Sequence, residues 1–380
     1  MTKILLHEPY FFGKEKNFLK KCIDTKWVST GGSYVSLFER EMSKFTKAKY
    51  AIALNSGTAA LDLSLNLLDV KKNDEVIVPS ITFISPINCV LYHNASPIFM
   101  DCDDTFNMDI KKTLEFITLE TSFNGKYSIN KKTKKIIKAL IIVHVFGNVV
   151  DFTKLRIICK KRNIKILEDA SESLGSFSNK KIHTGLIGDI GCLSFNANKI
   201  ITTGAGGMIL TNNKNFATKA KYLSTQAKDD SFYFIHNDIG YNSRLNNLNA
   251  AVGCAQIKYI NNILLKKRNI HNVYKKNILK LKNFKLISSK NFINENHWLN
   301  VILFSDKINR ENLIQLFNKN KIETRPVWWP NHLQSKMKKF QRYKINKIDK
   351  IIDKALCLPS GYNLDKKKLY KIVTILKNFE

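Results

Sequence analysis

The stretch that decides the fold is Leu193-Ser-Phe-Asn-Ala-Asn-Lys199-Ile-Ile-Thr-Thr-Gly-Ala-Gly-Gly207. It places Lys199 between an apolar strand that carries Ser194 and a glycine-rich turn. Upstream, the run Ile-Leu-Glu-Asp-Ala at 166–170 predicts a buried strand that ends on an acid, Asp169. An amine that can form a Schiff base, an acid for a ring nitrogen, and groups for a phosphate are the parts of a pyridoxal 5′-phosphate (PLP) site. The alternative is that Lys199 is an ordinary lysine in a lysine-rich chain, but the residues around it favour a cofactor role.

Short apolar runs alternate with helical patterns over most of the first two thirds of the chain. This alternation predicts an α/β domain with a mostly parallel central sheet flanked by helices, and functional residues in loops at the strand ends. The expected strands are 50–54, 75–78, 97–100, 138–143, 164–167, 191–195 and 207–211, with helices at 59–68, 86–91 and 152–161. The polar stretch 120–135 is expected to be a surface insertion.

The remaining third of the sequence predicts a smaller α+β region. A long helical pattern at 245–281 should bridge to it. The expected strands are 298–304 and 323–327, and the expected helices are 310–318 and 368–378. We therefore expect a PLP-binding large domain with an N-terminal arm at 1–250, followed by the bridging helix and a small C-terminal domain at 251–380.

Composition excludes several classes of protein. The chain has 380 residues, and its 62 basic and 31 acidic side chains give a net charge of +31. This charge alone would suit a nucleic-acid-binding protein, but the lysines are scattered and no DNA- or RNA-binding motif accompanies them. No apolar run approaches the ~20 residues of a membrane span, and the start does not resemble a signal peptide. The seven cysteines form no C-x-x-C pair, which argues against a disulfide framework or a metal site. We expect a cytoplasmic protein with no nucleic-acid or membrane partner.

Two further motifs suit a phosphorylated ring cofactor. The turn Asn55-Ser56-Gly57-Thr58 follows a predicted strand and opens a predicted helix, where free N–H groups and the helix dipole favour a phosphate. An N-capped helix with nothing bound is the alternative. Phe83 follows the next strand and could stack on a cofactor ring, although an aromatic residue there could equally belong to the core.

Together these motifs resemble the DegT/DnrJ/EryC1/StrS family of sugar aminotransferases, which are fold-type-I PLP enzymes. The resemblance runs from Glu8-Pro9-Tyr10 and residues 24–31 to residues 357–361. Within the family, the chain is most similar to the subgroup that aminates nucleotide-linked 2-acetamido-4-keto-6-deoxyhexoses on bacillosamine- and legionaminic-acid-type routes. Residues 168–175, 226–230 and 324–334 carry that finer similarity.

The resemblance implies a role for each matching residue. Lys199 would bind PLP covalently and move protons, and Asp169 would pair with the ring nitrogen. The other expected cofactor-binding residues are Ser56, Gly57, Thr58, Phe83, Glu172, Ser194 and, from a partner subunit, Asn242. The expected substrate-binding residues are Ser29, Thr30, Arg325, Trp329 and His332. Two positions depart from many members of the family: Glu172 stands where Gln is common, and Ala205 where Glu is common.

The activity implied by the resemblance is transfer of an amino group from glutamate to the C4 ketone of a nucleotide-linked sugar. The sugar would be a UDP- or GDP-linked 4-keto-6-deoxyhexose, used for bacterial surface glycans such as lipopolysaccharide. A homodimer with shared active sites is also implied. The alternative from another class is a regulatory or binding protein that keeps the PLP fold without turnover.

Overall fold

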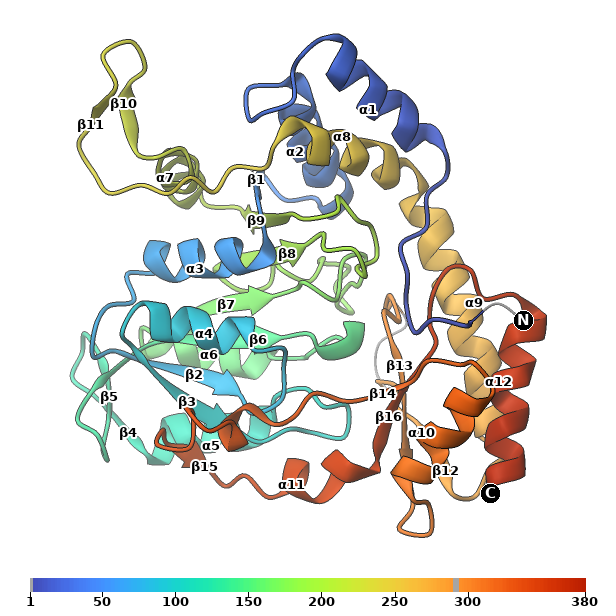
Figure 1. The fold of residues 1–380 in the computed structure, drawn as a ribbon. Coiled ribbons are helices and arrows are strands. Elements are labelled where there is room, and N and C mark those ends of the chain that lie inside the picture. The colour runs from blue at the N-terminus through green and yellow to red at the C-terminus, as the bar shows by residue number, and fades with distance from the viewer. Residues whose placement is uncertain (1–2, 290–293) are drawn as a thin grey trace.

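A computed structural model describes residues 3–289 and 294–380 (Figure 1). Within these residues, a ten-stranded sheet forms the centre of the larger part of the molecule, in the order β1-β9-β8-β7-β6-β2-β3-β15, with β4 and β5 attached beside β6. The strands on the main path are β1 (Tyr50–Leu54), β9 (Gly207–Thr211), β8 (Ile190–Ser194), β7 (Lys165–Asp169), β6 (Ile136–Val143), β2 (Glu75–Pro79), β3 (Ser96–Met100) and β15 (Arg342–Tyr343).

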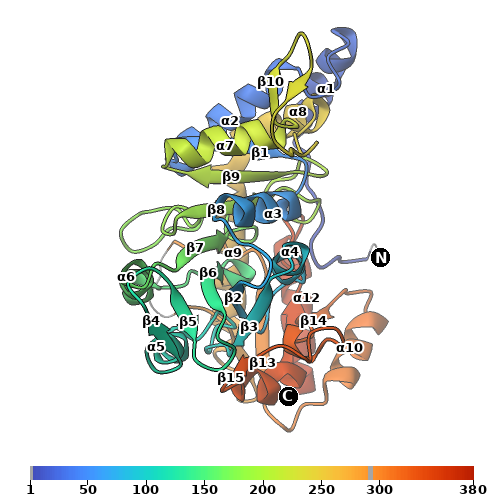
Figure 2. The same cartoon turned by 90° about the vertical axis from the view of Figure 1, so that its left-hand side faces the viewer.

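The central sheet is mostly parallel, as the strand–helix alternation predicted. The strands from β8 to β15 run parallel, and β9 is antiparallel to both of its neighbours. Helices cover both faces, with α3 (Gly57–Leu67) and α4 (Ser85–Tyr92) on one side and α5 (Ile110–Leu119) and α6 (Thr153–Lys161) on the other (Figure 2). Every residue of β2 and β9 is buried, because both faces of the sheet are covered.

A four-stranded antiparallel sheet forms the centre of the smaller region, in the order β12-β13-β16-β14 within the described residues. Its strands are β12 (Phe284–Leu286), β13 (Asn300–Phe304), β16 (Ala355–Leu358) and β14 (Arg325–Pro326). The predicted bridge is α8 (Asn247–Gln256) followed by α9 (Ile260–Ile278), and the helices are α10 (Arg310–Lys319) and α12 (Lys366–Phe379). One apolar core joins α9, α10 and α12 to the small sheet.

The chain crosses between the two regions more than once. Near the N-terminus, Ile4 pairs with Ile322 of the smaller region before the chain reaches α1 (Lys14–Asp24) and α2 (Ser33–Thr46), which pack on α8. Later, β15 returns from the smaller region to the edge of the large sheet. The domain boundary expected at residue 250 stays a prediction.

The stretch 120–135 is exposed at its turn, residues 122–126, as expected of a surface insertion, but it also extends the large sheet. It forms β4 (Thr121–Phe123) and β5 (Ser128–Asn130), a hairpin that joins the large sheet beside β6. Asn130 is fully buried and donates a hydrogen bond of 2.8 Å to Glu75. The amide of Asn130 also donates to Gln341 at 2.8 Å, so this buried polar side chain has partners outside the hairpin in place of water.

A second hairpin, β10 (Lys228–Asp230) and β11 (Ile235–His236), follows α7 (Lys214–Ser224) and projects from the body of the molecule (Figure 1). Its tip exposes Phe232, Tyr233 and Phe234. Among the described helices, none is both long enough and apolar enough to cross a bilayer.

Candidate active site

A cavity of about 420 Å³ lies where the strands of the large sheet end. It brings together most of the residues expected to bind a cofactor, and one of those expected to bind a substrate. The predicted residues that line it are Ser56, Gly57, Thr58, Phe83, Asp169, Glu172, Ser194, Lys199 and Arg325. Residues from distant parts of the chain meet here because the carboxyl ends of parallel strands share one edge of the sheet.

One wall of the cavity is the start of α3, which can hold a phosphate. Ser56 caps the helix, its Oγ accepting a 3.0 Å hydrogen bond from the N–H of Ala59. A Cβ added at Gly57 would lie 2.9 Å from the Cβ of Ser194, so only glycine allows the helix to approach β8 this closely. The hydroxyls of Thr58 and Ser194, the free N–H groups and the helix dipole together favour an anion at this wall.

Asp169 lies at the end of β7 and is 5% exposed. Its Oδ1 accepts a 3.0 Å hydrogen bond from the N–H of Ser171, and burial raises the pKa of the carboxyl. Among the described residues, none forms an ion pair with Asp169. A protonated ring nitrogen would supply the missing positive charge, so this residue fits PLP.

Lys199 reaches the cavity from the loop after β8. Its Nζ lies 3.6 Å from Oε1 of Glu172 and 4.3 Å from the centre of the Trp298 ring. The other oxygen of Glu172 accepts a 2.8 Å hydrogen bond from the N–H of Phe146. Burial is the main cause that raises the pKa of Glu172 to about 7. Lys199 and Asp169 therefore line the same cavity as the helix start, the arrangement that a Schiff-base lysine and a pyridine-nitrogen partner require.

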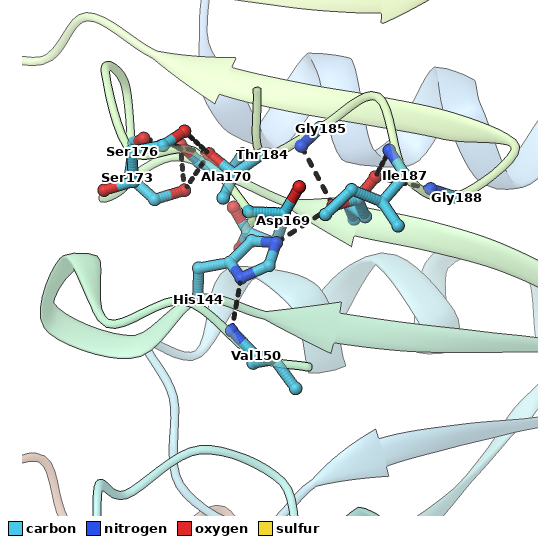
Figure 3. A network of polar contacts seen from close by, with 12 residues as sticks. His144, Val150, Asp169, Ala170, Ser173, Ser176, Thr184, Gly185, Ile187 and Gly188 are labelled. Atoms are coloured by element: carbon cyan, nitrogen blue, oxygen red, sulfur yellow. Dashed lines mark hydrogen bonds and ion pairs between the residues drawn. The ribbon is translucent and has the colours of Figure 1, made fainter. Parts of the chain in front are cut away.

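Behind Asp169, a buried polar network fixes the end of β7 (Figure 3). Nε2 of His144 lies 2.9 Å from Glu168, and the N–H of Val150 donates to Nδ1 of the same ring. Because Nδ1 accepts, Nε2 carries the proton and donates to Glu168. That carboxylate also accepts from three backbone N–H groups, those of Gly185, Ile187 and Gly188.

The other predicted site residues lie outside this cavity in the single chain. Ser29 and Asn242 are exposed, and Thr30 is half-buried beside Ser29. Trp329 is 53% exposed, whereas His332 is buried with its Nε2 3.1 Å from Asp349. Their expected roles, including the contribution of Asn242 to a partner subunit, stay predictions.

Two of the residues that line the cavity and were not predicted from the sequence are tryptophans. The sequence predicts Trp298 only as part of a strand and predicts Trp329 as a substrate-binding residue, whereas Trp298 and Trp328 are the two tryptophans that line the cavity. The double tryptophan was a signal, but the side chain that faces inward depends on a single residue of register. No set of three or more His, Cys, Asp and Glu side chains in the described part of the chain is placed to hold a metal ion.

Comparisons with known proteins agree with the geometry. GDP-perosamine synthase from Escherichia coli O157:H7 is 33% identical over 381 aligned residues, covering 100% of this chain and 99% of the relative. UDP-4-amino-4,6-dideoxy-N-acetyl-beta-L-altrosamine transaminase from Campylobacter jejuni is 31% identical, covering 73% of this chain and 71% of the relative.

The fold is also shared with solved structures. The Helicobacter pylori aminotransferase PseC superposes with a TM-score of 0.89 at 24% identity, covering 100% of this chain and 99% of that one. The DegT/DnrJ/EryC1/StrS aminotransferase family matches residues 12–377. The chain therefore belongs to the DegT/DnrJ/EryC1/StrS aminotransferase family, as the sequence resemblance predicted.

Proposed function

We propose that this chain is a PLP-dependent aminotransferase that moves an amino group from glutamate to the C4 ketone of a nucleotide-linked 4-keto-6-deoxyhexose. The observation that carries the proposal is the shared cavity, in which Lys199, the unpaired Asp169 and the start of α3 face one space. PLP is the cofactor of this aminotransferase family, and each of these groups matches one part of it.

Each residue has a separate task in the proposed reaction. When bound, PLP supplies an electron sink for the charge left when a proton leaves the carbon that carries the amine. Asp169 keeps the ring nitrogen protonated, and Ser56, Gly57 and Thr58 anchor the phosphate. Lys199 takes the proton from the α-carbon of glutamate and delivers it to C4′ of the cofactor. With the sugar, the same amine moves the proton in the opposite direction.

The substrate class is supported by the names of the relatives. One is named for a GDP-linked amino sugar and another for a UDP-linked 4-amino-4,6-dideoxy sugar. Arg325 lines the cavity and provides a cation near its wall. The net charge of +31 would also draw a diphosphate toward the protein. A panel of candidate substrates would identify the nucleotide and test for the 2-acetamido group expected from the sequence.

A homodimer with shared active sites is part of the proposal. The exposed aromatic tip of the β10–β11 hairpin, formed by Phe232, Tyr233 and Phe234, is suited to contact with a second copy. Asn242 follows that hairpin and is exposed, so it is accessible to a partner.

The test is an absorbance spectrum of the purified protein with PLP, recorded before and after addition of glutamate. We expect a visible cofactor band that glutamate removes and one member of a panel of UDP- and GDP-linked 4-keto-6-deoxy sugars restores. The panel includes sugars with hydroxyl and with acetamido groups at C2, so it also identifies the substrate. A band that glutamate leaves unchanged would support the non-catalytic alternative, and no band at all would refute the role of Lys199.

A further inference from the structure

The amine of Lys199 contacts two residues, Trp298 and Glu172, that are themselves connected through a chain of side-chain contacts. On one side it lies over the ring of Trp298, at 4.3 Å, and that ring stacks on Trp328 with centres 6.5 Å apart. Trp328 stacks in turn on Phe146, with centres 4.8 Å apart and planes inclined by 17°. The N–H of Phe146 bonds to Glu172, whose other oxygen faces the amine at 3.6 Å. The amine therefore lies between a ring face and a carboxyl that are themselves connected.

Trp298 is held more firmly than packing alone would require. It is 3% exposed, and its indole N–H donates a 2.6 Å hydrogen bond to the carbonyl of Asn198, the residue before Lys199. Its backbone N–H donates to Oδ1 of Asn296 at 2.9 Å. Bonds at the backbone and at the indole N–H leave the ring little freedom to turn away from the amine.

The carbonyl of Trp298 accepts a hydrogen bond from a buried lysine, Lys267. Nζ of Lys267, a lysine that is 1% exposed, donates to the carbonyls of Trp298 and Ser360 at 2.7 and 2.6 Å. Burial lowers the pKa of Lys267 far below its ordinary range. The amine has N–H groups for both carbonyls. Lys267 therefore ties the segment that carries Trp298 to α9.

We propose that Trp298 is a positioning residue for Lys199: its ring face, together with Glu172, holds Nζ facing the cofactor cavity. A lysine side chain has several rotatable bonds, and restricting them costs entropy that a bound position must offset. An aromatic face within about 6 Å of a lysine ammonium offers that attraction, and more strongly where water is excluded. The inference rests on the proposed function, since it assigns the ring a task only if Lys199 binds PLP.

The experiment compares Trp298→Leu, Trp298→Phe and the wild type as proteins freed of PLP. Each is mixed with excess PLP, and the rate at which the visible cofactor band develops is followed at several pH values. Leu removes both the ring face and the indole N–H, whereas Phe keeps a ring face and loses only the N–H. We expect Leu to slow the band about tenfold at the highest pH, where the amine is neutral and able to attack PLP, because the order of magnitude of the effect is the entropy lost on ordering a lysine side chain. Phe should recover most of the rate.

Controls separate positioning from folding. Affinity for PLP is measured in Lys199→Ala and in Lys199→Ala with Trp298→Leu, where no covalent bond forms; we expect equal affinities. If Trp298→Leu develops the band as fast as the wild type, or if the double variant loses PLP affinity by the same factor, the positioning role is refuted. A wild type that develops no band refutes the proposed function itself, so the two failures are distinguishable.

Discussion

Glu172 makes the stability of the protein without PLP depend on pH. The carboxyl is 5% exposed, and burial raises its pKa from 4.5 to about 7. Between these values the folded protein holds a proton that the unfolded chain has released. Stability therefore falls as pH rises from 4.5 to about 7 and is constant above that range. The loss for this one group is about 3 kcal/mol.

Replacing Glu172 by Gln removes the titration and keeps the shape. The amide oxygen can still accept the hydrogen bond from Phe146. Above pH 7 we expect the variant to be more stable than the wild type by up to about 3 kcal/mol, and at pH 4.5 by close to zero. The assay is equilibrium urea unfolding of the protein without PLP, repeated from pH 4.5 to 8.5. A gain that is independent of pH, or that is largest in acid, would refute the reasoning.

Glu295 provides a matched control. It is 4% exposed, accepts a 2.8 Å hydrogen bond from the N–H of Val149, and has its pKa raised to about 7, chiefly by burial. Glu295→Gln should give the same pH-dependent gain in stability. Because Glu295 does not line the cavity, its replacement should leave the rate of transamination unchanged, whereas Glu172→Gln changes the surroundings of Lys199.

Three further predictions concern the cavity. Lys199→Ala should bind PLP without the visible covalent band and lower transamination by at least about 10²-fold, as expected for loss of an acid–base group; a wild-type rate would end the proposal. Asp169→Asn should slow the removal of the band by glutamate by about 10²-fold, measured by stopped-flow absorbance, and an unchanged rate would show that the ring nitrogen does not depend on it. Gly57→Ala should weaken PLP binding in an equilibrium titration by about tenfold, because the new Cβ lies 2.9 Å from Ser194 and displaces the helix start; unaltered affinity would move the phosphate site elsewhere.

The sequence predicted those parts of the site that are local in the chain. Asp169 is the last residue of β7, Lys199 lies in the loop after β8, and Gly57 lies just after β1, so these strand ends could be recognised without any long-range information. The α/β class followed from the same alternation. Their meeting in one cavity follows from the parallel sheet, which brings the ends of separate strands to one edge.

The contacts between distant segments could not be predicted in this way. Trp298 lies in the smaller region and contacts Lys199, and the sequence that flanks either residue does not predict this contact. The choice between Trp328 and Trp329 depends on which of two adjacent side chains points inward, which a pattern of residue types does not decide. The antiparallel direction of β9 between β1 and β8 is likewise not decided by the periodicity of the strand.

The adjacent acids Glu168 and Asp169 show how partners distinguish structure from function. Both end β7, and successive side chains of a strand point to opposite faces. The carboxylate of Glu168 accepts hydrogen bonds from three backbone N–H groups and from the ring of His144. Asp169 faces the cavity, and Ser171 donates to it through its backbone N–H and its side chain. A buried carboxylate with so few partners is costly to keep unless a ligand supplies the rest. This difference in hydrogen-bond partners indicates a structural role for Glu168 and a cofactor-binding role for Asp169.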